Sequence, residues 1–338
     1  MTATMKASYL MKQGELSVRE VAIPTLAEDE VLVRVAAVGV CGSDVHYYQH
    51  GKIGPYVVNH PLILGHELSG TIEAVGSAVD PSRVGKRVAV EPQRPCRVCS
   101  ECKAGRYNLC PDIEFYATPP IDGAFAEFVK IQSDFAFDLP DNVSFEAAAL
   151  IEPLSVCIWA AQRAEIREGS RVLIAGAGPI GVIMAQVASA FGASEVIITD
   201  ITEDRRNFAL EHGATKALDP RTDDVESLGV DAFVDASGVA QAVYSGIKAV
   251  GPAGHALLVG LGTEDMSLPV SHIQNKEIWV TGVFRYANTW PTGIELVASG
   301  KVNLDVLVTH TFGLDDVESA LNAGKLPGSM KAIVHPGR

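Results

Sequence analysis

The segment over residues 172–194 carries no charged side chain, and it restricts the possible folds of this chain more than any other feature. It is long enough to cross a bilayer, but Pro179 and the glycines at 176, 178 and 181 would break the first third of a membrane helix. The segment therefore predicts a buried strand, a tight turn and a buried helix, and no membrane span.

Strand-like and helix-like segments alternate from residue 171 onward. Short apolar strands joined by helices are typical of a parallel sheet that is covered on both faces. The first 150 residues instead contain short apolar runs separated by Gly and Pro, which favours β structure, and a helix is expected over 144–161. The strands expected in the alternating part span 171–175, 195–199, 231–236 and 256–260.

Length and pattern together predict two domains, since a domain holds roughly 150 residues and the chain has 338. The predicted fold class is α/β. A β-rich domain over 1–150 is followed by a doubly wound, parallel-sheet nucleotide-binding domain over 151–284. Residues 285–338 mix strand and helix signals, and we expect them to return to the first domain.

Composition excludes several classes of protein. Hydrophobic side chains make up 47% of the chain and charged ones 20%, which excludes a disordered chain. Asp and Glu number 41 against 27 Lys and Arg, a net charge of −14, so we expect no nucleic-acid partner and no membrane partner. The N-terminal residues lack the apolar core of a signal peptide, and six cysteines are too few for a disulfide scaffold. We therefore expect a cytoplasmic protein in a reducing compartment.

The run Gly176-Ala177-Gly178-Pro179-Ile180-Gly181 fits the pattern G-x-G-x-x-G between an expected strand and an expected helix. Such glycines let the backbone approach a pyrophosphate, and Asp200, at the end of the next strand, can accept hydrogen bonds from both adenosine ribose hydroxyls. A 2′-phosphate at about 4 Å from this carboxylate would be repelled by about 4 kcal/mol at an effective dielectric constant near 20, which favours NAD over NADP. A structural glycine turn with a capping Asp200 is the alternative.

Two further features belong to the same expected site. Arg205 and Arg206 lie shortly after Asp200, where either can stack on adenine or both can be solvated helix residues. A second glycine cluster, Val259-Gly260-Leu261-Gly262, ends a later strand, which is where a parallel sheet binds its ligand.

Four cysteines crowd into one short segment, over about 91–111, with the spacing C-x2-C-x2-C-x7-C. Four thiolates in one loop suit a tetrahedral zinc ion with no open position, which predicts a structural zinc site that does no chemistry. An iron–sulfur cluster is an alternative, because Pro111 follows the last cysteine as in bacterial ferredoxins, and a loop without metal is another. The four residues are Cys96, Cys99, Cys102 and Cys110.

A second set of metal-binding side chains precedes this loop. Cys41, His66 and Glu67 can supply a thiolate, an imidazole and a carboxylate, which with water would form an open zinc site able to take a substrate oxygen. Taken singly, Cys41 and His66 are also typical of buried core residues. Glu152 lies in the apolar run 147–154, where a carboxylate requires a partner or a metal.

These motifs carry a family resemblance that extends from about Lys6 to Val334. The sequence resembles the zinc-containing medium-chain alcohol dehydrogenases, and within them the branch of sorbitol and xylitol dehydrogenases. Animal sorbitol dehydrogenases lack the four-cysteine loop, whereas many bacterial and fungal relatives keep it. The most specific stretches are Cys-Gly-Ser-Asp-Val-His-Tyr at 41–47, Leu-Gly-His-Glu at 64–67, Ala-Thr-Pro-Pro at 117–120, Ile-Glu-Pro-Leu-Ser-Val at 151–156, Gly-Ala-Gly-Pro-Ile-Gly at 176–181 and Val-Phe-Arg-Tyr-Ala-Asn-Thr-Trp-Pro at 283–291.

The resemblance implies a fold and a role for each matching residue. The fold is a GroES-like catalytic domain interrupted by a Rossmann domain. Cys41, His66 and Glu67 match the ligands of a catalytic zinc. Ser43 and His46 match the relay that carries the alcohol proton to solvent.

The resemblance also implies a substrate pocket and a set of cofactor contacts. Glu152 matches a carboxylate beside the zinc-bound water that takes part in catalysis and also contacts the substrate. The wall of the polyol pocket further matches Tyr47, Phe115, Arg285 and Tyr286. The NAD contacts match Gly176, Gly178, Pro179, Ile180, Gly181, Asp200, Arg205, Val259, Gly260, Leu261, Val283, Phe284 and Arg285.

The activity expected from this resemblance is the oxidation of a secondary hydroxyl of a polyol to the ketose, with hydride transfer to NAD. One catalytic and one structural zinc per chain and a homotetramer are implied with it. Two alternatives stay open. One is a dehydrogenase of another secondary alcohol, such as threonine or an aliphatic 2-alkanol, and the other is a catalytically silent protein that binds NAD and zinc.

Overall fold

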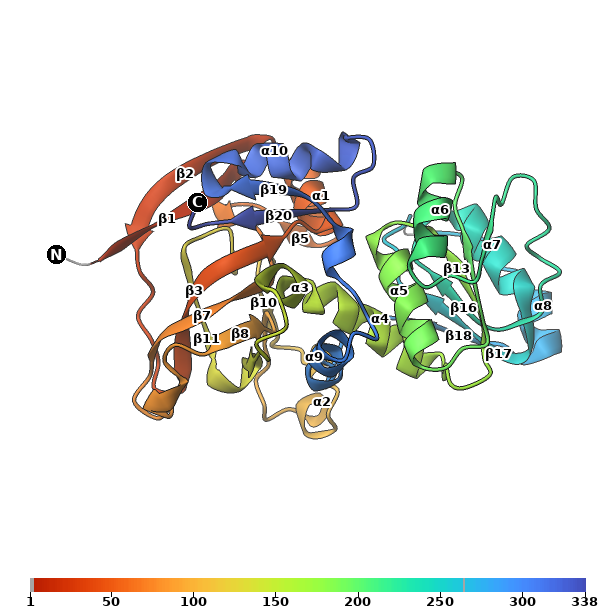
Figure 1. Cartoon of the computed structure of the whole chain (residues 1–338), viewed down its shortest axis with the longest axis horizontal. Helices are drawn as coiled ribbons and strands as arrows, with labels where there is room; N and C mark the ends of the chain where they lie inside the picture. Colours follow the sequence, from red (N-terminus) through yellow and green to blue (C-terminus); the bar gives the residue numbers. More distant parts are fainter. Residues whose placement is uncertain (1–2, 264) are drawn as a thin grey trace. The chain divides into compact units, whose positions relative to one another are not determined.

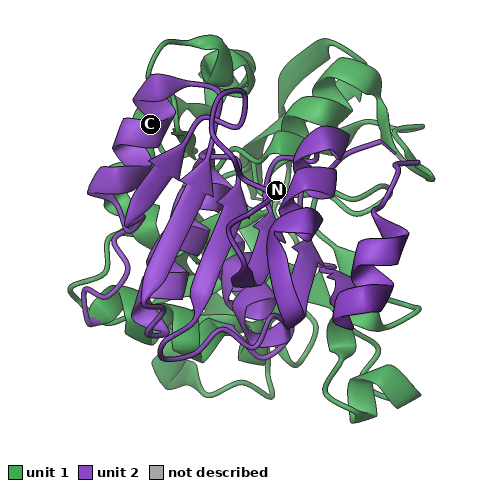
Figure 2. Ribbon diagram, turned by 90° about the vertical axis from the view of Figure 1, so that its right-hand side faces the viewer, with its two compact units in different colours: residues 1–152, 290–298, 304–338 green, residues 153–289, 299–303 purple. Residues whose placement is uncertain are grey.

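The computed structural model describes residues 3–263 and 265–338, which fall into two compact units (Figure 2). Unit 1 comprises the residues up to Glu152 together with Trp290–Ala298 and Leu304–Arg338, and unit 2 comprises Pro153–Thr289 and Ser299–Asn303. The sequence places the return to the first domain at residue 285, whereas residues 285–289 and 299–303 lie in unit 2.

Hydrogen bonds explain why the segment before residue 304 belongs to unit 2. The main-chain N–H of Asn303 donates to Oε1 of Gln186 (2.7 Å), and Nε2 of Gln186 donates to the carbonyl of Asn303 (3.2 Å). Gln186 lies on α5 (Pro179–Ala190) and is buried there, so this exchange fastens residues 299–303 to a helix of unit 2.

Unit 1 is built around a sheet of seven described strands (Figure 1). Its order is β12-β8-β7-β3-β20-β19, with β11 also paired to β3; β19 and β20 run parallel, and the other described pairs are antiparallel. The strands are β3 (Glu30–Gly39), β7 (Glu67–Val75), β8 (Arg87–Val90), β11 (Phe128–Gln132), β12 (Ala136–Asp138), β19 (Val308–Gly313) and β20 (Lys331–His335).

Smaller sheets and short helices complete unit 1. A three-stranded sheet contains β2 (Glu15–Ala22), β1 (Thr4–Lys12) and β6 (Leu62–Ile63). Two further sheets have two strands each and pair β4 (Lys52–Ile53) with β5 (Tyr56–Val57) and β9 (Gln93–Arg94) with β10 (Glu114–Phe115). The helices are α1 (Gly42–His50), α2 (Ser100–Lys103), α3 (Phe145–Ala149), α9 (Trp290–Ala298) and α10 (Val317–Asn322). Single 3-10 turns lie at Pro81–Arg83, Tyr107–Leu109, Ser133–Phe135, Asp305–Leu307, Leu314–Asp316 and Ala323–Lys325.

The single helix expected over 144–161 is two helices, α3 and α4 (Ile151–Arg163), separated by Leu150. Ser144 caps α3, since its hydroxyl accepts a hydrogen bond from Ala147 N–H (2.9 Å). Pro153 explains the break. Without an N–H it cannot donate to the carbonyl four residues earlier, but it is tolerated in the first turn of a new helix.

Unit 2 is a doubly wound parallel sheet, as the alternating pattern predicts. Its described strands run in the order β15-β14-β13-β16-β17-β18, which in chain order is 3-2-1-4-5-6, the order of a dinucleotide-binding sheet. The strands are β13 (Arg171–Ala175), β14 (Glu195–Thr199), β15 (Lys216–Leu218), β16 (Val230–Asp235), β17 (Val250–Leu258) and β18 (Trp279–Gly282). The helices besides α4 and α5 are α6 (Glu203–Glu211), α7 (Ala240–Ala249) and α8 (Val270–Lys276).

The uncharged segment over 172–194 folds as predicted, into β13, a turn and α5. Val172, Ile174 and the neighbouring residues of α5 are buried, which accounts for the absence of charge. Within the described ranges, none of the helices combines the length and the apolar character needed to cross a membrane.

Glu91, directly after β8, is a buried acid in unit 1. Its carboxylate accepts hydrogen bonds from Nε2 of Gln93 (2.6 Å) and from the Tyr107 hydroxyl (2.9 Å). Burial nevertheless raises the pKa of Glu91 to about 7, because both donors compensate only part of the lost hydration.

We expect Glu91→Gln to stabilise the protein above neutral pH. The pKa of Glu91 is higher in the folded than in the unfolded chain, so the native state binds the extra proton, and wild-type stability falls as pH rises from 4.5 to about 7. The shift corresponds to about 3 kcal/mol at most. Urea unfolding of both proteins at about pH 5 and about pH 8 measures this, and a gain of the same size at both pH values would contradict it.

Candidate functional site

Cys41 lies between β3 and α1, at the N-cap of the helix. Its main-chain N–H donates to Oδ2 of Asp44 (3.0 Å), three residues further on, which fixes the first turn of the helix. The local sequence therefore places the Cys41 thiol between the end of β3 and the start of α1.

Asp44 connects this turn to the segment that carries His66. The carboxylate is fully buried, and its Oδ1 accepts a hydrogen bond from Gly65 N–H (2.9 Å) and lies 3.5 Å from Nδ1 of His66. Burial alone would lower the pKa of His66, but the Asp44 carboxylate and the sulfur of Cys41 outweigh it and raise that pKa well above its usual value. A carboxylate beside one ring nitrogen orients an imidazole so that the other nitrogen can bind a metal.

The side chains of Cys41, His66 and Glu67 converge, and their ligand atoms lie within 4.8 Å of one another. Glu67 opens β7, and its carboxylate accepts hydrogen bonds from Nζ of Lys331 on β20, which also donates to the carbonyl of Val40 (2.9 Å). One sulfur, one nitrogen and one oxygen donor, with no fourth protein ligand in the cluster formed by the described residues, fit a zinc ion with an open position.

Glycine at position 39 provides the space that Glu67 needs. A Cβ added at Gly39 would lie 2.1 Å from Oε2 of Glu67. Any larger residue at the end of β3 would therefore displace the carboxylate.

The other predicted residues of unit 1 lie around this cluster to different degrees. Phe115, on β10, packs its ring 5.4 Å from the ring of His66. Glu152 is buried and lies outside the three-ligand cluster. Burial alone would lower the pKa of Lys331, but nearby negative charges outweigh it and raise that pKa; Glu67 contributes more to this rise than Glu152 does. Three others lie on α1: Ser43 is half-buried, His46 is exposed and Tyr47 is buried.

The sulfur atoms of Cys96, Cys99, Cys102 and Cys110 also lie within 4.8 Å of one another, and none of them forms a disulfide. Main-chain N–H groups point at three of the sulfurs. Cys96 donates to Cys110, Cys99 to Cys96 and Cys102 to Cys99, each at 3.4 Å. Four thiols with amide donors around them fit a closed tetrahedral zinc site, because the amides stabilise negatively charged sulfur.

The glycine-rich turn of unit 2 joins β13 to α5. Gly176 has φ +95°, a left-handed conformation that favours glycine, and a Cβ on Gly181 would lie 1.8 Å from the carbonyl oxygen of Gly176. Gly178 is the N-cap of α5 and Pro179 its first residue, so the helix presents unpaired N–H groups at its N-terminus. This geometry can bind a pyrophosphate.

Asp200, directly after β14, faces this turn. Its Oδ2 accepts a hydrogen bond from Ala177 N–H (2.9 Å) and its Oδ1 accepts one from Thr202 N–H (2.8 Å). These bonds orient the carboxylate and leave acceptor sites for ribose hydroxyls. Asp200 and Gly176 line an open cavity of about 590 Å³ in unit 2. Nη1 of Arg205 lies 3.7 Å from the position of a Cβ on Gly178, beside the turn.

Most of the remaining predicted cofactor residues follow β17 and β18, at the same carboxyl edge of the sheet. The N–H groups of Val259 and Gly260 both donate to the carbonyl of Asp235, and Val283 N–H donates to that of Leu258. The carboxyl edge is where an open parallel sheet binds its ligand. Ile180 lies in the first turn of α5, Leu261 is exposed, the guanidinium of Arg285 lies 4.8 Å from the ring centre of Phe284, and Tyr286 is buried.

Sequence reasoning assigned no role to Asp44, Gly39 or Lys331. The three-residue spacing from Cys41 to Asp44 at a helix start is a capping signal that could have identified Asp44. Lys331 lies 264 residues from Glu67, so no local pattern announces their ion pair.

Comparisons with known proteins agree with this geometry. Residues 27–141 match the family model of the alcohol dehydrogenase GroES-like domain, and residues 179–299 match that of the zinc-binding dehydrogenases. A sorbitol dehydrogenase of Bacillus subtilis (strain 168) is 44% identical over 345 residues, covering 99% of this chain and 98% of that protein.

Solved structures also match over nearly the whole chain. A zinc-binding dehydrogenase from Sinorhizobium meliloti 1021, bound to NADP, has a TM-score of 0.91 at 32% identity and covers 99% of this chain and 100% of that one. An alcohol dehydrogenase from Escherichia coli CFT073, complexed with NADH, has a TM-score of 0.92 at 29% identity, with 98% and 99% covered. The resemblance carried by the motifs is confirmed, and the chain belongs to the zinc-containing medium-chain alcohol dehydrogenases, with their GroES-like and Rossmann folds.

Proposed function

We propose that this chain oxidises a secondary hydroxyl of a polyol, such as sorbitol or xylitol, to the ketose and transfers the hydride to NAD. The observation that carries the proposal is the convergence of Cys41, His66 and Glu67 in unit 1 of a chain that is 44% identical to a sorbitol dehydrogenase. Asp200 in unit 2 supports NAD as the cofactor, because its carboxylate suits ribose hydroxyls and repels a 2′-phosphate.

Each side chain of the metal cluster has a defined task. Zinc held by Cys41, His66 and Glu67 supplies Lewis-acid chemistry at the substrate oxygen, and NAD supplies the hydride acceptor. Asp44 orients the imidazole of His66, and Lys331 compensates the buried charge of Glu67. The four cysteines of the other cluster hold a structural zinc, which stabilises their loop.

Ser43 and His46 supply the route for the hydroxyl proton. They are three residues apart on α1 and therefore lie on the same face of the helix. Ser43 is half-buried and His46 exposed, so a proton passed from the substrate hydroxyl to Oγ of Ser43 and then to the imidazole of His46 reaches solvent. An imidazole suits this step because one of its ring nitrogens can accept a proton while the other donates one.

Polar side chains assigned by the family resemblance favour polyols over simple alkanols. In the roles that the resemblance implies, Glu152 would accept a hydrogen bond from a substrate hydroxyl, Arg285 and Tyr286 would donate to others, and Tyr47 and Phe115 would supply apolar wall. An alkanol would leave such groups unpaired, at about 1–3 kcal/mol per buried group. The test measures NADH formation with sorbitol, xylitol, galactitol, threonine, 2-propanol and ethanol. Turnover of threonine or 2-propanol without any polyol would reject this substrate class.

Cys41→Ser is expected to abolish turnover and to lower the zinc content from two ions to one per chain, because the cluster loses its sulfur ligand. Binding of NADH should persist, since the nucleotide site lies in unit 2. The matched variant is Cys102→Ser, which should also lose one zinc but lower the thermal midpoint more than Cys41→Ser does. Full activity of Cys41→Ser would contradict the catalytic assignment.

Asp200→Ala is expected to raise the Kd for NADH by about tenfold or more, because hydrogen bonds to a charged group contribute about 1.5–3 kcal/mol each. Removal of the repulsive charge should simultaneously narrow the preference for NADH over NADPH. Fluorescence titration with both nucleotides measures this. An unchanged ratio of the two Kd values would show that Asp200 is not the ribose ligand.

We also propose a homotetramer in the cytoplasm. The family resemblance supports the tetramer, and β18 supports an interface, since within the described sheet it pairs with β17 alone and exposes 71% of Trp279. The six cysteines, all among the described residues, form no disulfide, which suits a reducing compartment.

Trp279→Glu is expected to shift the assembly toward smaller species, because it places a charge on the open edge strand. Sedimentation equilibrium measures the mass of wild type and variant. The control is Leu210→Glu, an equally drastic change at an exposed position on α6, next to the opposite edge strand, and it should leave the mass unchanged. Equal masses for Trp279→Glu and wild type would exclude this edge from the interface.

A further inference from the structure

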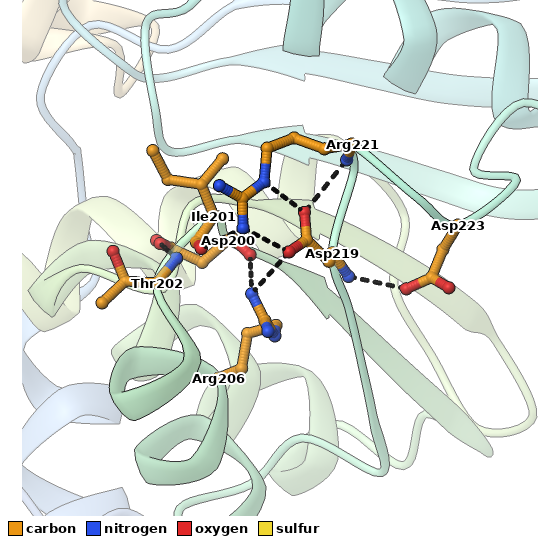
Figure 3. A network of polar contacts seen from close by, with 7 residues as sticks. All are labelled: Asp200, Ile201, Thr202, Arg206, Asp219, Arg221 and Asp223. Atoms are coloured by element: carbon orange, nitrogen blue, oxygen red, sulfur yellow. Dashed lines mark hydrogen bonds and ion pairs between the residues drawn. The ribbon is translucent and has the colours of Figure 1, made fainter.

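Asp219, directly after β15, collects hydrogen bonds from two arginines beside the nucleotide site (Figure 3). Arg221 donates to it from the main-chain N–H (3.0 Å), from Nε (2.9 Å) and from Nη2 (2.5 Å). Arg206, on α6, donates from Nη1 at 3.3 Å. The side-chain hydrogen bonds from Arg221 lower the pKa of Asp219 below its usual value, so the carboxylate is ionised at neutral pH.

The same two guanidinium groups also contact the main chain next to Asp200. Arg221 Nη2 donates to the carbonyl of Ile201 (2.9 Å), and Arg206 Nη1 donates to the carbonyl of Asp200 (2.7 Å), as Figure 3 shows. Both cations therefore contact the main chain at, or next to, the residue whose carboxylate we assign to the ribose. The Nε and Nη2 donors of Arg221 and the Nη1 donor of Arg206 face Asp219 and these carbonyl oxygens.

Acidic side chains outnumber basic ones in the lining of the cavity. Arg221 is the single arginine or lysine that lines it among the described residues, and 62% of its side chain is exposed. The acidic residues in the lining are Asp200, Asp223, Asp224 and Glu226. An arginine near the ribose is what accommodates a 2′-phosphate in NADP-binding proteins of this fold. The cation that could play this part is held in a two-point contact with Asp219.

We propose that Asp219 is a second determinant of NAD selection, which acts by holding the guanidinium of Arg221 away from the ribose 2′ position. Asp219 is a positioning residue, because it acts through Arg221 and does not itself line the cavity. This inference rests on the proposed nucleotide site and deepens it. Asp200 repels the 2′-phosphate, and Asp219 withholds the cation that would attract it.

The proposal separates two effects in NADPH binding. Asp200→Ala removes the repulsion, but Arg221 stays bound to Asp219, so NADPH gains no attractive partner. A second change, Asp219→Asn, removes the charge that holds Arg221. The amide oxygen of asparagine can still accept the main-chain N–H of Arg221, which preserves the turn over 219–223.

The test is a fluorescence titration of NADPH and NADH with three variants of the full chain: Asp200→Ala, Asp200→Ala/Asp219→Asn, and the triple variant with Arg221→Ala. The second variant should bind NADPH about tenfold more tightly than the first, the effect expected for one charge-assisted hydrogen bond. The Kd for NADH should change less than about threefold. Arg221→Ala should abolish the gain for NADPH, which assigns it to this guanidinium.

A matched control removes one negative charge from the lining of the cavity, close to Asp219 in the chain, without releasing an arginine. Asp224→Asn fits, because Asp224 accepts from Ser227 N–H (3.3 Å) and forms no ion pair with any described residue. In the Asp200→Ala background it should improve NADPH binding much less than Asp219→Asn does. An equal improvement would overturn the proposal, because net charge alone would then explain it.

The outcomes separate this inference from the proposed function. If Asp200→Ala leaves NADH binding unchanged, the ribose assignment itself fails. If Asp200→Ala weakens NADH binding but Asp219→Asn brings no gain for NADPH, only the role of Asp219 fails. Circular dichroism checks that each variant is folded, and Asp219→Ser supplies the same loss of charge should Asp219→Asn unfold.

Discussion

The buried carboxylate of Asp44 is the interaction on which the candidate active site depends. It accepts hydrogen bonds from the main chain of Cys41 and Gly65 and lies against the ring of His66. These contacts fix the start of α1 relative to the start of β7, although the two segments are separate in the chain. An ionised group without water is stable only where donors surround it, so the same contacts that keep Asp44 charged also set the positions of two metal ligands.

Charge compensation extends this principle to the third ligand. Glu67 is buried, and Lys331 from the last strand of the chain neutralises it while also donating to the carbonyl of Val40, next to Cys41. β20 lies beside β3 in the sheet, which brings Lys331 to this position. The C-terminal segment therefore helps to position the candidate metal ligands, although it supplies none of them. Removing one member of such a buried pair leaves an uncompensated charge, which is why Glu67 and Lys331 must be present together.

The structural features that depend on residues close together in the sequence could be predicted from local sequence patterns. The turn of Gly176, Gly178 and Gly181 and the four-cysteine cluster are each encoded within a short window, and the parallel sheet followed from the alternation of strands and helices. The convergence of Cys41 with His66 and Glu67 was expected from the family resemblance, because spacing alone does not bring these residues together. The contacts of Glu67 with Lys331 and of Gln186 with Asn303 join residues more than 100 positions apart, so no window contains them. The break between α3 and α4 was predictable from Pro153, but the strong apolar pattern on both sides of it suggested one continuous helix.

The choice between NAD and NADP depends little on the fold itself. Dehydrogenase structures with TM-scores of 0.91 and 0.92 to this chain hold NADP in one case and NADH in the other. The sheet, the glycine turn and the helix N-terminus serve the pyrophosphate that both nucleotides share, so they cannot discriminate between them. Discrimination requires charges at the ribose, and in unit 2 we assign this part to the residues that follow β14 and β15. A single carboxylate at the ribose is enough to repel a 2′-phosphate. It excludes NADP, however, only if the nearby cations are already paired with other carboxylates and cannot attract that phosphate. For this reason the nucleotide site that we propose includes the ion pairs of Asp219 with Arg206 and Arg221 as well as Asp200.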